Sequence, residues 1–218
     1  MTAEILAVLA AYLAGAIPFG LLIGKLGYGK DLREYGSRNT GATNAYRVLG
    51  LPAAILVFLC DAIKGAFGVR AAGYAATYVG ATPEAIQLWE VAGGLVAMAG
   101  HNWSVFLGFK GGRGVATGLG VLLCLSPIVS MIAFGIWGII VKLTRYVSLG
   151  SVIAATSVPL LMYVTGDSFV YIAFGSAAAL FILIRHRENI VRLMNGTELK
   201  AERSAEDADG RKKGADRT

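Results

Sequence analysis

Residues 115–141, VATGLGVLLCLSPIVSMIAFGIWGIIV, form an apolar run that decides how the chain can fold. As one straight helix the run would be about 40 Å long, whereas the hydrocarbon core of a bilayer is about 30 Å thick. Ser126 and Pro127 lie near its middle, and proline removes a backbone donor and breaks or kinks a helix. The run is therefore predicted to form a short broken hairpin near Pro127, which returns the chain to the side of the membrane on which it started.

The composition places the rest of the chain in a membrane as well. Its 218 residues are 56% hydrophobic and 16% charged, whereas a soluble domain averages about a quarter charged residues. A spanning helix needs about 20 apolar residues. Further runs of this kind occur at residues 5–25, 52–72, 86–107, 147–165 and 168–184. We therefore predict an all-α, polytopic integral membrane protein with seven transmembrane helices.

The distribution of lysine and arginine predicts the orientation of these helices. Both residue types occur in segments 25–47, 108–114 and 142–146 and are absent from segments 71–85 and 164–168. Because basic residues concentrate in cytoplasmic loops, the N-terminus is predicted to lie outside and the C-terminus in the cytoplasm. The formal net charge of +6 has the same explanation, so it does not indicate a nucleic-acid partner. No basic residue precedes the first apolar run, which favours an uncleaved span over a signal peptide.

The cysteines and the C-terminal end suggest no additional chemistry. Cys60 and Cys124 each lie inside an apolar run, where a buried thiol is expected rather than a disulfide or a metal pair. From Lys200 onward the chain has mixed charges and no core-forming pattern. We predict a membrane domain at 1–199 and a disordered, dispensable cytoplasmic tail at 200–218.

Polar residues are concentrated in three segments that the predicted topology places on the cytoplasmic face. The first is REYGSRNTGATNAYRVLG, residues 33–50, with three arginines, two asparagines and three glycines. Its candidate substrate ligands are Ser37, Asn39, Thr43, Asn44 and Arg47. Taken alone, the segment would also be explained as an ordinary solvent loop.

The second segment, GHNWSVFLGFKGGRGVATG at residues 100–118, has the composition of a phosphate-binding loop. Its basic residues are interleaved with glycines and followed at once by a predicted helix start. Glycine lets backbone N–H groups approach an anion, and a helix N-terminus carries about half a positive charge. The candidate residues are His101, Asn102, Lys110, Gly111, Gly112, Arg113 and Gly114. The alternative is a plain turn after a transmembrane helix.

The third segment contains His186, Glu188 and Asn189 at the end of the last apolar run. One helical turn places His186 and Asn189 on the same face. With a reference pKa of about 6.5, the imidazole of His186 is a candidate base near neutral pH. An interfacial histidine beside anchoring arginines is the alternative.

Two charges lie within the second apolar run. Asp61 and Lys64 are three residues apart and share one helix face. A charge at membrane depth costs about 2.5–3.5 kcal/mol on insertion scales unless it is paired or faces a polar cavity. The two residues either form an internal ion pair or line the functional site, and the sequence leaves both alternatives open.

Together these motifs resemble the bacterial membrane glycerol-3-phosphate acyltransferases that use acyl phosphate, the PlsY family. The resemblance extends from about Ala14 to Glu198 and rests on REYGSRNTGATNAYRVLG, DAIKG, GHNWSVFLGFKGGRGVATGLG, SLGSV and HRENIVRLMNGTE, in this order. It implies seven membrane helices, an extracellular N-terminus, an active site facing the cytoplasm and no need for coenzyme A. The sequence departs from the family pattern at Arg38 and Thr40, where glycine and proline are usual, and at Arg113, where lysine is usual.

The implied reaction transfers a fatty acyl group from acyl phosphate to the 1-hydroxyl of sn-glycerol 3-phosphate, an early step of phospholipid synthesis in the bacterial cytoplasmic (inner) membrane. Acyl phosphate has a good leaving group, so no cofactor or metal is expected. Either His186 or the substrate's own phosphate could accept the hydroxyl proton. We expect Ser37 to bind phosphate or hydroxyl rather than to be acylated. The catalytic candidates are His186, Ser37 and Asn189. The substrate-binding candidates are Asn39, Thr43, Asn44, Arg47, Asp61, Lys64, His101, Asn102, Lys110, Gly111, Gly112, Arg113, Gly114 and Glu188.

Two other classes of protein fit some of the same features. A transporter of an organophosphate would also need a basic, glycine-rich site, although no convincing internal repeat of the kind usual in secondary transporters is present. A lipid-interaction scaffold is the other alternative. The partners predicted for an enzyme are acyl phosphate, glycerol 3-phosphate and membrane lipid. The sequence does not determine the oligomeric state.

Overall fold

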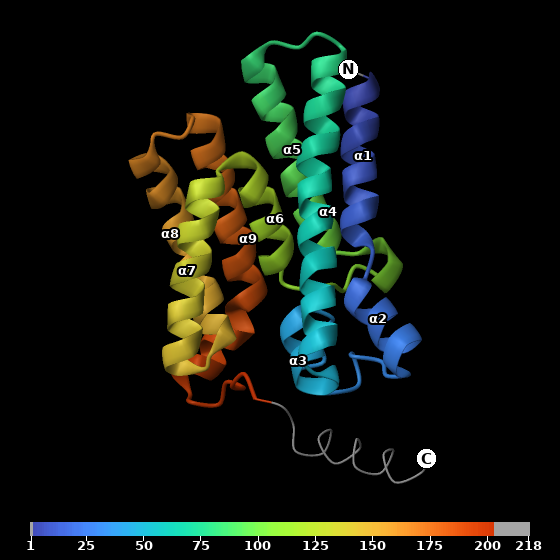
Figure 1. Ribbon diagram of the computed structural model, residues 1–218, viewed down its shortest axis with the longest axis vertical. Coiled ribbons are helices and arrows are strands. Elements are labelled where there is room, and N and C mark those ends of the chain that lie inside the picture. Colours follow the sequence, from blue (N-terminus) through green and yellow to red (C-terminus); the bar gives the residue numbers. More distant parts are fainter. Residues whose placement is uncertain (1, 203–218) are drawn as a thin grey trace.

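All regular secondary structure in residues 2–202, which are the residues that the computed structural model describes, is helical (Figure 1). The helices are α1 (Thr2–Ala16), α2 (Phe19–Tyr28), α3 (Ala42–Leu49), α4 (Leu51–Tyr78), α5 (Pro83–Asn102), η1 (Val105–Leu107), α6 (Val115–Leu125), α7 (Pro127–Thr144), α8 (Val147–Thr165) and α9 (Phe169–Met194). No strand occurs among these residues, so the all-α prediction is confirmed. Residues 203–218 lie outside the described part, and the disorder of the tail stays a prediction.

The break expected at Ser126–Pro127 is confirmed. α7 begins at Pro127. In the first turn of a helix the backbone N–H groups have no partner within the helix, so proline loses no hydrogen bond there. The hydroxyl of the preceding Ser126 donates a hydrogen bond to Asp167 over 2.9 Å. α6 has 11 residues and α7 has 18, which correspond to about 16 Å and about 27 Å. Because the two helices share this turn and α6 is the shorter, α6 begins deeper in the bundle than the far end of α7 (Figure 1).

The first apolar run also contains a break, which the sequence interpretation missed. α1 and α2 are bent by 43° at Ile17 and Pro18. Pro18 cannot donate a backbone hydrogen bond, so the helix stops before it. The carbonyl of Ile17 accepts a hydrogen bond from the Lys64 ammonium over 2.9 Å. A charged side chain from α4 therefore satisfies part of the interrupted backbone.

The number of membrane spans is only partly supported by the described residues. α4, α7, α8 and α9 are each long and apolar enough to cross a membrane, and the bent pair α1–α2 makes a fifth span if it is counted as one. α5 does not meet the same criterion of length and apolar composition, and α6 is too short to cross a bilayer alone. The chain is a multi-pass membrane protein, and the count of seven remains a prediction.

The helices form two groups with α6 between them (Figure 1). α4 packs against α1, α5 and α6 in one group, and α8 packs against α7 and α9 in the other. The close approach of α4 to α5 requires small residues, because a Cβ added at Gly93 would collide with the carbonyl of Gly68. The apolar core that connects the groups includes Val69, Met98, Val121, Met162 and Phe174.

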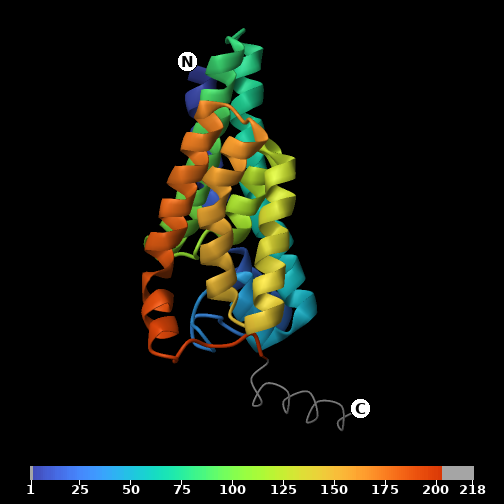
Figure 2. The same ribbon diagram turned by 90° about the vertical axis from the view of Figure 1, so that its left-hand side faces the viewer.

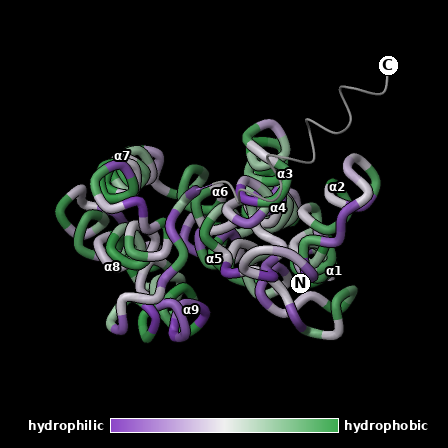
Figure 3. The backbone as a smooth tube through the Cα atoms, turned by 90° about the horizontal axis from the view of Figure 1, so that it is seen from below, coloured by the Kyte–Doolittle hydropathy of each residue, from purple (hydrophilic) through white to green (hydrophobic). Residues whose placement is uncertain are grey.

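The connecting segments gather at the two ends of the bundle (Figures 1 and 2). The N-terminus, the α4–α5 turn and the α8–α9 turn lie at one end, whereas α3, the α7–α8 turn and the chain after α9 lie at the other. Figure 3 shows mainly hydrophobic residues along the helices, as a lipid-facing surface requires. This grouping matches the one inferred from lysine and arginine, while the membrane side that each end faces remains a prediction.

Candidate active site

A cavity of about 410 Å³ lies between the two groups of helices. Its polar end is lined by residues of all three polar segments, namely Ser37, Asn39, Thr43, Asn44, Arg47, His101, Arg113, Gly114 and His186, together with Asp61 and Glu198. Its apolar part is lined by α4 and α6–α9 and includes Ile55, Phe58, Leu122, Trp137, Val158 and Phe174. Segments far apart in the sequence therefore meet at one polar mouth that opens into an apolar space.

Asn44 holds the first polar segment in its fold. This fully buried amide donates hydrogen bonds to the carbonyls of Leu32, Tyr35 and Asn39 over 2.9, 3.1 and 2.8 Å. Its Oδ1 accepts from the backbone N–H of Ser37 over 2.8 Å. Since these contacts occupy the amide, Asn44 shapes the loop that presents Ser37 to the cavity and has little capacity left for a substrate.

The same loop holds Arg38 in a backbone conformation that favours glycine. Arg38 has a φ of 57°, in the left-handed region that glycine adopts without strain. This backbone conformation is a physical reason to expect glycine at position 38, as the family resemblance implies. Arg38 itself is exposed and does not line the cavity.

Arg47 reaches the polar mouth from α3. Its Nε and Nη2 donate to the backbone carbonyls of Lys200 and Leu199 over 3.1 and 2.8 Å. Burial lowers the pKa of Arg47, and the nearby Glu198 carboxylate opposes that shift. A guanidinium has five N–H donors, so after these two contacts three remain for a ligand in the cavity.

The glycine segment is held in place by Arg185, which the sequence interpretation did not single out. Its Nε and Nη2 donate to the carbonyls of Gly112 and Gly111 over 3.0 and 2.8 Å. The N–H of Gly112 in turn donates to the carbonyl of His101 over 3.0 Å, and a Cβ at Gly112 would collide with the His101 ring. The segment leads into the N-terminus of α6 at Gly114, which lines the cavity.

Arg113 is the cation of this segment that faces the cavity. Burial lowers its pKa to about 10, so the guanidinium remains protonated near neutral pH. Within residues 2–202 its guanidinium makes no hydrogen bond, although the Glu198 carboxylate attracts it electrostatically. A charged fork that lacks hydrogen-bond acceptors suits a phosphate ligand.

Several predicted residues lie outside the cavity lining. Lys110 and Glu188 are exposed, Lys64 is buried below the mouth, and Gly111 and Gly112 form the back of the loop. Asn102 is fully buried beside Gly114, and its side-chain amide has no hydrogen-bond partner within the described chain. These residues are near the cavity, but the structure does not place them on its surface.

His186 is buried in α9 and lines the cavity. Its Nδ1 lies 2.8 Å from the carbonyl oxygen of Ile182. Because a carbonyl oxygen can only accept, Nδ1 carries the proton in the neutral ring, and Nε2 keeps its lone pair. Nε2 is therefore the atom that could accept a proton. No hydrogen bond joins His186 to the Ser37 hydroxyl among the residues described here.

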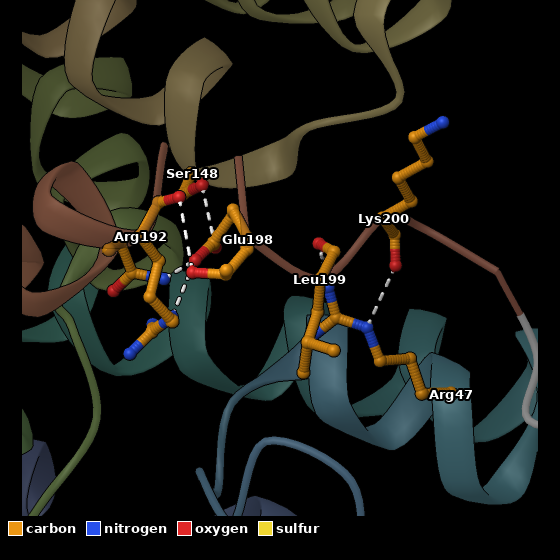
Figure 4. Close-up of polar contacts among 8 residues, drawn as sticks. Arg47, Ser148, Arg192, Glu198, Leu199 and Lys200 are labelled. Carbon is orange, nitrogen blue, oxygen red and sulfur yellow. Dashed lines mark hydrogen bonds and ion pairs between the residues drawn. The ribbon is translucent and has the colours of Figure 1, made fainter. Parts of the chain in front are cut away.

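Glu198 and its partner Ser148 line the cavity and were missed by the sequence interpretation, which did single out the partner Asn189. The carboxylate accepts hydrogen bonds from Ser148, Asn189 and Arg192 over 2.8, 2.6 and 2.8 Å (Figure 4). A signal was present, because Ser148 and Glu198 belong to the quoted motifs SLGSV and HRENIVRLMNGTE. What the sequence lacked was any indication that the chain after α9 turns back to the mouth.

Asp61 and Lys64 form the internal ion pair that was one of the two alternatives. Their charged atoms are 2.7 Å apart, and both side chains are almost fully buried. The Nδ1 atom of His101 lies 3.6 Å from the same Asp61 oxygen, too far for a hydrogen bond. Asp61 and His101 also line the cavity, so the pair both connects helices and borders the site.

No group of three or more His, Cys, Asp or Glu residues among residues 2–202 has the arrangement of a metal site. Cys60 and Cys124 are free thiols.

A membrane-embedded bundle with a cationic mouth above an apolar cavity defines a class of protein that handles an anionic, lipid-like molecule. The glycerol-3-phosphate acyltransferase family profile matches residues 5–196. A glycerol-3-phosphate acyltransferase of Desulfotalea psychrophila is 46% identical over 190 residues, which cover 87% of this chain and 94% of the relative. One from Synechococcus sp. (strain JA-3-3Ab) is 44% identical over 194 residues, covering 89% and 91%.

A solved structure extends the similarity to the fold. The crystal structure of PlsY, an integral membrane glycerol 3-phosphate acyltransferase, in its glycerol 3-phosphate form has a TM-score of 0.81 and 40% identity to this chain, covering 90% of it and 94% of that chain. Its lysophosphatidic acid form gives a TM-score of 0.78 and 38% identity. The chain belongs to the glycerol-3-phosphate acyltransferase family, of the PlsY type, and is an acyltransferase; the resemblance noted in the sequence is confirmed.

Proposed function

We propose that the protein transfers a fatty acyl group from acyl phosphate to the 1-hydroxyl of sn-glycerol 3-phosphate. The observation that carries this proposal is the single cavity, in which Arg47 and Arg113 lie at one end and an apolar space begins beside them. Both substrates carry a phosphate, and one of them also carries a fatty chain. The names of the relatives and the two ligand forms of the solved PlsY structure support glycerol 3-phosphate as the acceptor and lysophosphatidic acid as the product.

In this proposal the transfer is direct. The substrate hydroxyl oxygen forms a bond to the acyl carbonyl carbon, the carbon–oxygen bond to the phosphate breaks, and inorganic phosphate leaves. The hydroxyl proton passes to Nε2 of His186 or to the phosphate of glycerol 3-phosphate. Arg113 and the free N–H groups of Arg47 hold phosphate oxygens, and Ser37 contributes a hydroxyl at the same mouth.

Acyl phosphate is the proposed donor, rather than an acyl thioester of a nucleotide. The polar end of the cavity is compact, because α3, the glycine segment and the chain after α9 enclose it. A phosphate can occupy such a mouth while its acyl chain extends among α6–α9. A coenzyme A moiety would have to be accommodated outside it.

The proposed setting is the bacterial cytoplasmic membrane, with seven spans, the N-terminus outside and the mouth of the cavity in the cytoplasm. The support is the distribution of basic residues between the two ends of the bundle. In a background without Cys60 and Cys124, cysteines at exposed Arg33 and exposed Glu84 test it. In intact cells an impermeant thiol reagent should label the cysteine at position 84 and spare the one at 33, and the reverse pattern would invert the topology.

The function is tested with purified protein, labelled glycerol 3-phosphate and either palmitoyl phosphate or palmitoyl coenzyme A. Lysophosphatidic acid should form with the acyl phosphate and not with the thioester. Efficient turnover with the thioester alone would remove the donor assignment. Net flux of glycerol 3-phosphate into sealed vesicles without chemical change would instead identify a transporter.

A further inference from the structure

The chain after α9 crosses the mouth of the cavity. α9 ends at Met194, Gly196 turns the backbone with a φ of 70°, and residues Glu198–Ala201, here named the strap, run from α9 toward α3 (Figure 4). Glu198 and Ala201 both line the cavity. The strap therefore borders the proposed substrate site at a point where the sequence indicated only the beginning of a tail.

One end of the strap is fixed by the Glu198 carboxylate. Its side chain is 5% exposed and accepts from Ser148 of α8 and from Asn189 and Arg192 of α9. Burial alone would raise the pKa of Glu198, but these hydrogen bonds outweigh it, and the pKa lies below its usual value. The carboxylate is therefore ionised at neutral pH and holds two helices together at the mouth.

The other end of the strap is fixed through its backbone. The carbonyls of Leu199 and Lys200 accept from Arg47, and the N–H of Ala201 donates to the carbonyl of Arg145 over 2.8 Å. Arg47 and the Glu198 partners belong to opposite groups of helices. The strap thus connects the two groups across the opening: it is covalently continuous with α9 and is hydrogen-bonded to Arg47 of α3.

These contacts determine which side-chain atoms of Arg47 and Asn189 remain free. Two N–H groups of Arg47 point at strap carbonyls, which fixes the plane of the guanidinium and leaves its other three N–H groups available. A carboxylate can only accept, so Asn189 must turn its Nδ2 toward Glu198. Its Oδ1 is then left for another partner.

We propose that the strap is a positioning element of the active site, which holds Arg47 in the orientation that binds phosphate and fixes the orientation of the buried Asn189 amide. This inference rests on the proposed function, in which the free N–H groups of Arg47 hold phosphate oxygens; Asn189 is buried behind the cavity lining and acts through its contact with Glu198. In this proposal the strap acts through the side chains that it orients and not by binding the substrate itself. In this proposal the residues needed for activity extend to Ala201. The domain boundary predicted at residue 199 would then lie within the strap.

The test compares two isosteric changes in the same segment. Glu198→Gln removes the charge that holds three donors, whereas Glu202→Gln removes an exposed ion pair with Arg145, whose side chains are 66% and 56% exposed. We expect Glu198→Gln to raise the KM for glycerol 3-phosphate about tenfold or more, since a misplaced charge-assisted hydrogen bond has about that effect. Glu202→Gln should stay within about twofold of the wild type.

The comparison of KM with kcat separates positioning from folding. A variant that merely folds poorly loses active molecules, which lowers the maximal rate and leaves the KM unchanged. An unchanged KM in Glu198→Gln would therefore overturn the positioning role, whatever the maximal rate. Failure of the wild type to form lysophosphatidic acid would instead overturn the proposed function, so the two failures are distinguishable.

A double-mutant cycle tests the route through Arg47. If the strap acts partly by orienting Arg47, then Glu198→Gln should cost less in kcat/KM in an Arg47→Ala background than in the wild type. Fully additive losses would show that Glu198 and Arg47 act independently, which contradicts the proposal. Truncation after Glu202 should retain wild-type KM, and truncation after Gly196, which removes the strap, should raise it.

Discussion

Two buried polar clusters lie within one helical bundle, and they differ in what their charges are used for. The helix cluster consists of Asp61, Lys64 and His101; the mouth cluster consists of the cavity-lining residues Arg47, Arg113, His186 and Glu198, with Asn189 hydrogen-bonded to Glu198 behind them. In the helix cluster, the ammonium of Lys64 contacts the Asp61 carboxylate and a backbone carbonyl of the α1–α2 bend. In the mouth cluster, donors of Arg47 and Arg113 remain free beside a cavity.

The difference shows how buried charge can serve either cohesion or chemistry. A buried ion pair whose groups satisfy each other connects helices and leaves little for a ligand. A buried cation with spare donors and a neighbouring cavity is poised for an anion that is not part of the chain. Both clusters combine one or more cations, a carboxylate and a histidine in the protein interior, so the hydrogen-bond inventory is what distinguishes their roles.

The largest expected effect comes from removing the proposed base of the mouth cluster. His186→Gln keeps a polar side chain of similar reach but has no group that accepts a proton near neutral pH. Because general base catalysis typically contributes about 10²–10⁴-fold, kcat should fall by roughly that factor. The matched control is Arg187→Gln on the exposed side of the same helix, which should remain within about twofold of the wild type.

The pH profile of the same variant decides between two proton acceptors. The wild-type rate should fall toward acid as the acceptor becomes protonated, but the second ionisation of a phosphomonoester, at about 6, predicts a similar limb. Glu198 cannot cause it: despite the opposing effect of burial, hydrogen bonds hold its pKa below the ordinary 4.5, so its contacts weaken only as the pH falls below that range. Substantial turnover in His186→Gln with an unchanged acidic limb would make His186 a positioning residue and the substrate phosphate the base.

The next largest effect concerns the stability of the helix cluster. Asp61→Ala leaves the Lys64 ammonium buried without its counter-charge, and breaking a buried pair in this way typically costs about 3–5 kcal/mol. The free energy of unfolding in detergent, measured by chemical denaturation, should fall by that amount. Replacing both residues together, Asp61→Leu with Lys64→Met, should recover most of the loss. Equal instability of the single and double variants would show that the pair contributes more than mutual neutralisation.

The sequence predicted the helical architecture well where one residue carried the information. Pro127 in an overlong apolar run was sufficient to predict the α6–α7 break, which is present. Pro18 carries the same chemical signal, but its run is short enough for one span, so length gave no reason to expect the α1–α2 bend. The count of spans depends on α5 and α6, whose lengths and composition leave it a prediction.

The site was predictable as a set of segments but not as a set of ligands. All three polar segments reach the cavity, yet Asn44 is occupied by its own loop while Ser37 faces the cavity. Nothing in the residue types separates these two roles, because both follow from backbone contacts. Glu198 was missed for a related reason, since only the return of the chain after α9 brings it to the mouth.

A smaller effect is expected from Arg113, the cavity-lining arginine whose guanidinium makes no hydrogen bond among the described residues. Arg113→Ala should lower kcat/KM roughly tenfold to a hundredfold, because a hydrogen bond to a charged group is worth about 1.5–3 kcal/mol. The unfolding free energy should not fall with it, since the Arg113 guanidinium makes no hydrogen bond within residues 2–202. Arg113→Lys, which keeps the charge but not the fork, should recover part of the activity. A loss of stability without a loss of affinity would place Arg113 in the scaffold.

The smallest effect should come from Lys110, which belongs to the same glycine segment as Arg113 but is exposed and does not line the cavity. Its charge acts on the mouth only through solvent, where screening weakens interactions beyond about 10 Å at 0.1 M salt. Lys110→Ala should therefore change kcat/KM by about twofold or less, and raising the salt should remove even that difference. The sequence alone gave Lys110 and Arg113 equal standing as phosphate ligands, so the two alanine variants measured side by side test what the cavity adds. A salt-independent loss in Lys110→Ala as large as that in Arg113→Ala would mean that Lys110 contacts the substrate directly, and the spare cation of the mouth cluster would then be Lys110 rather than Arg113.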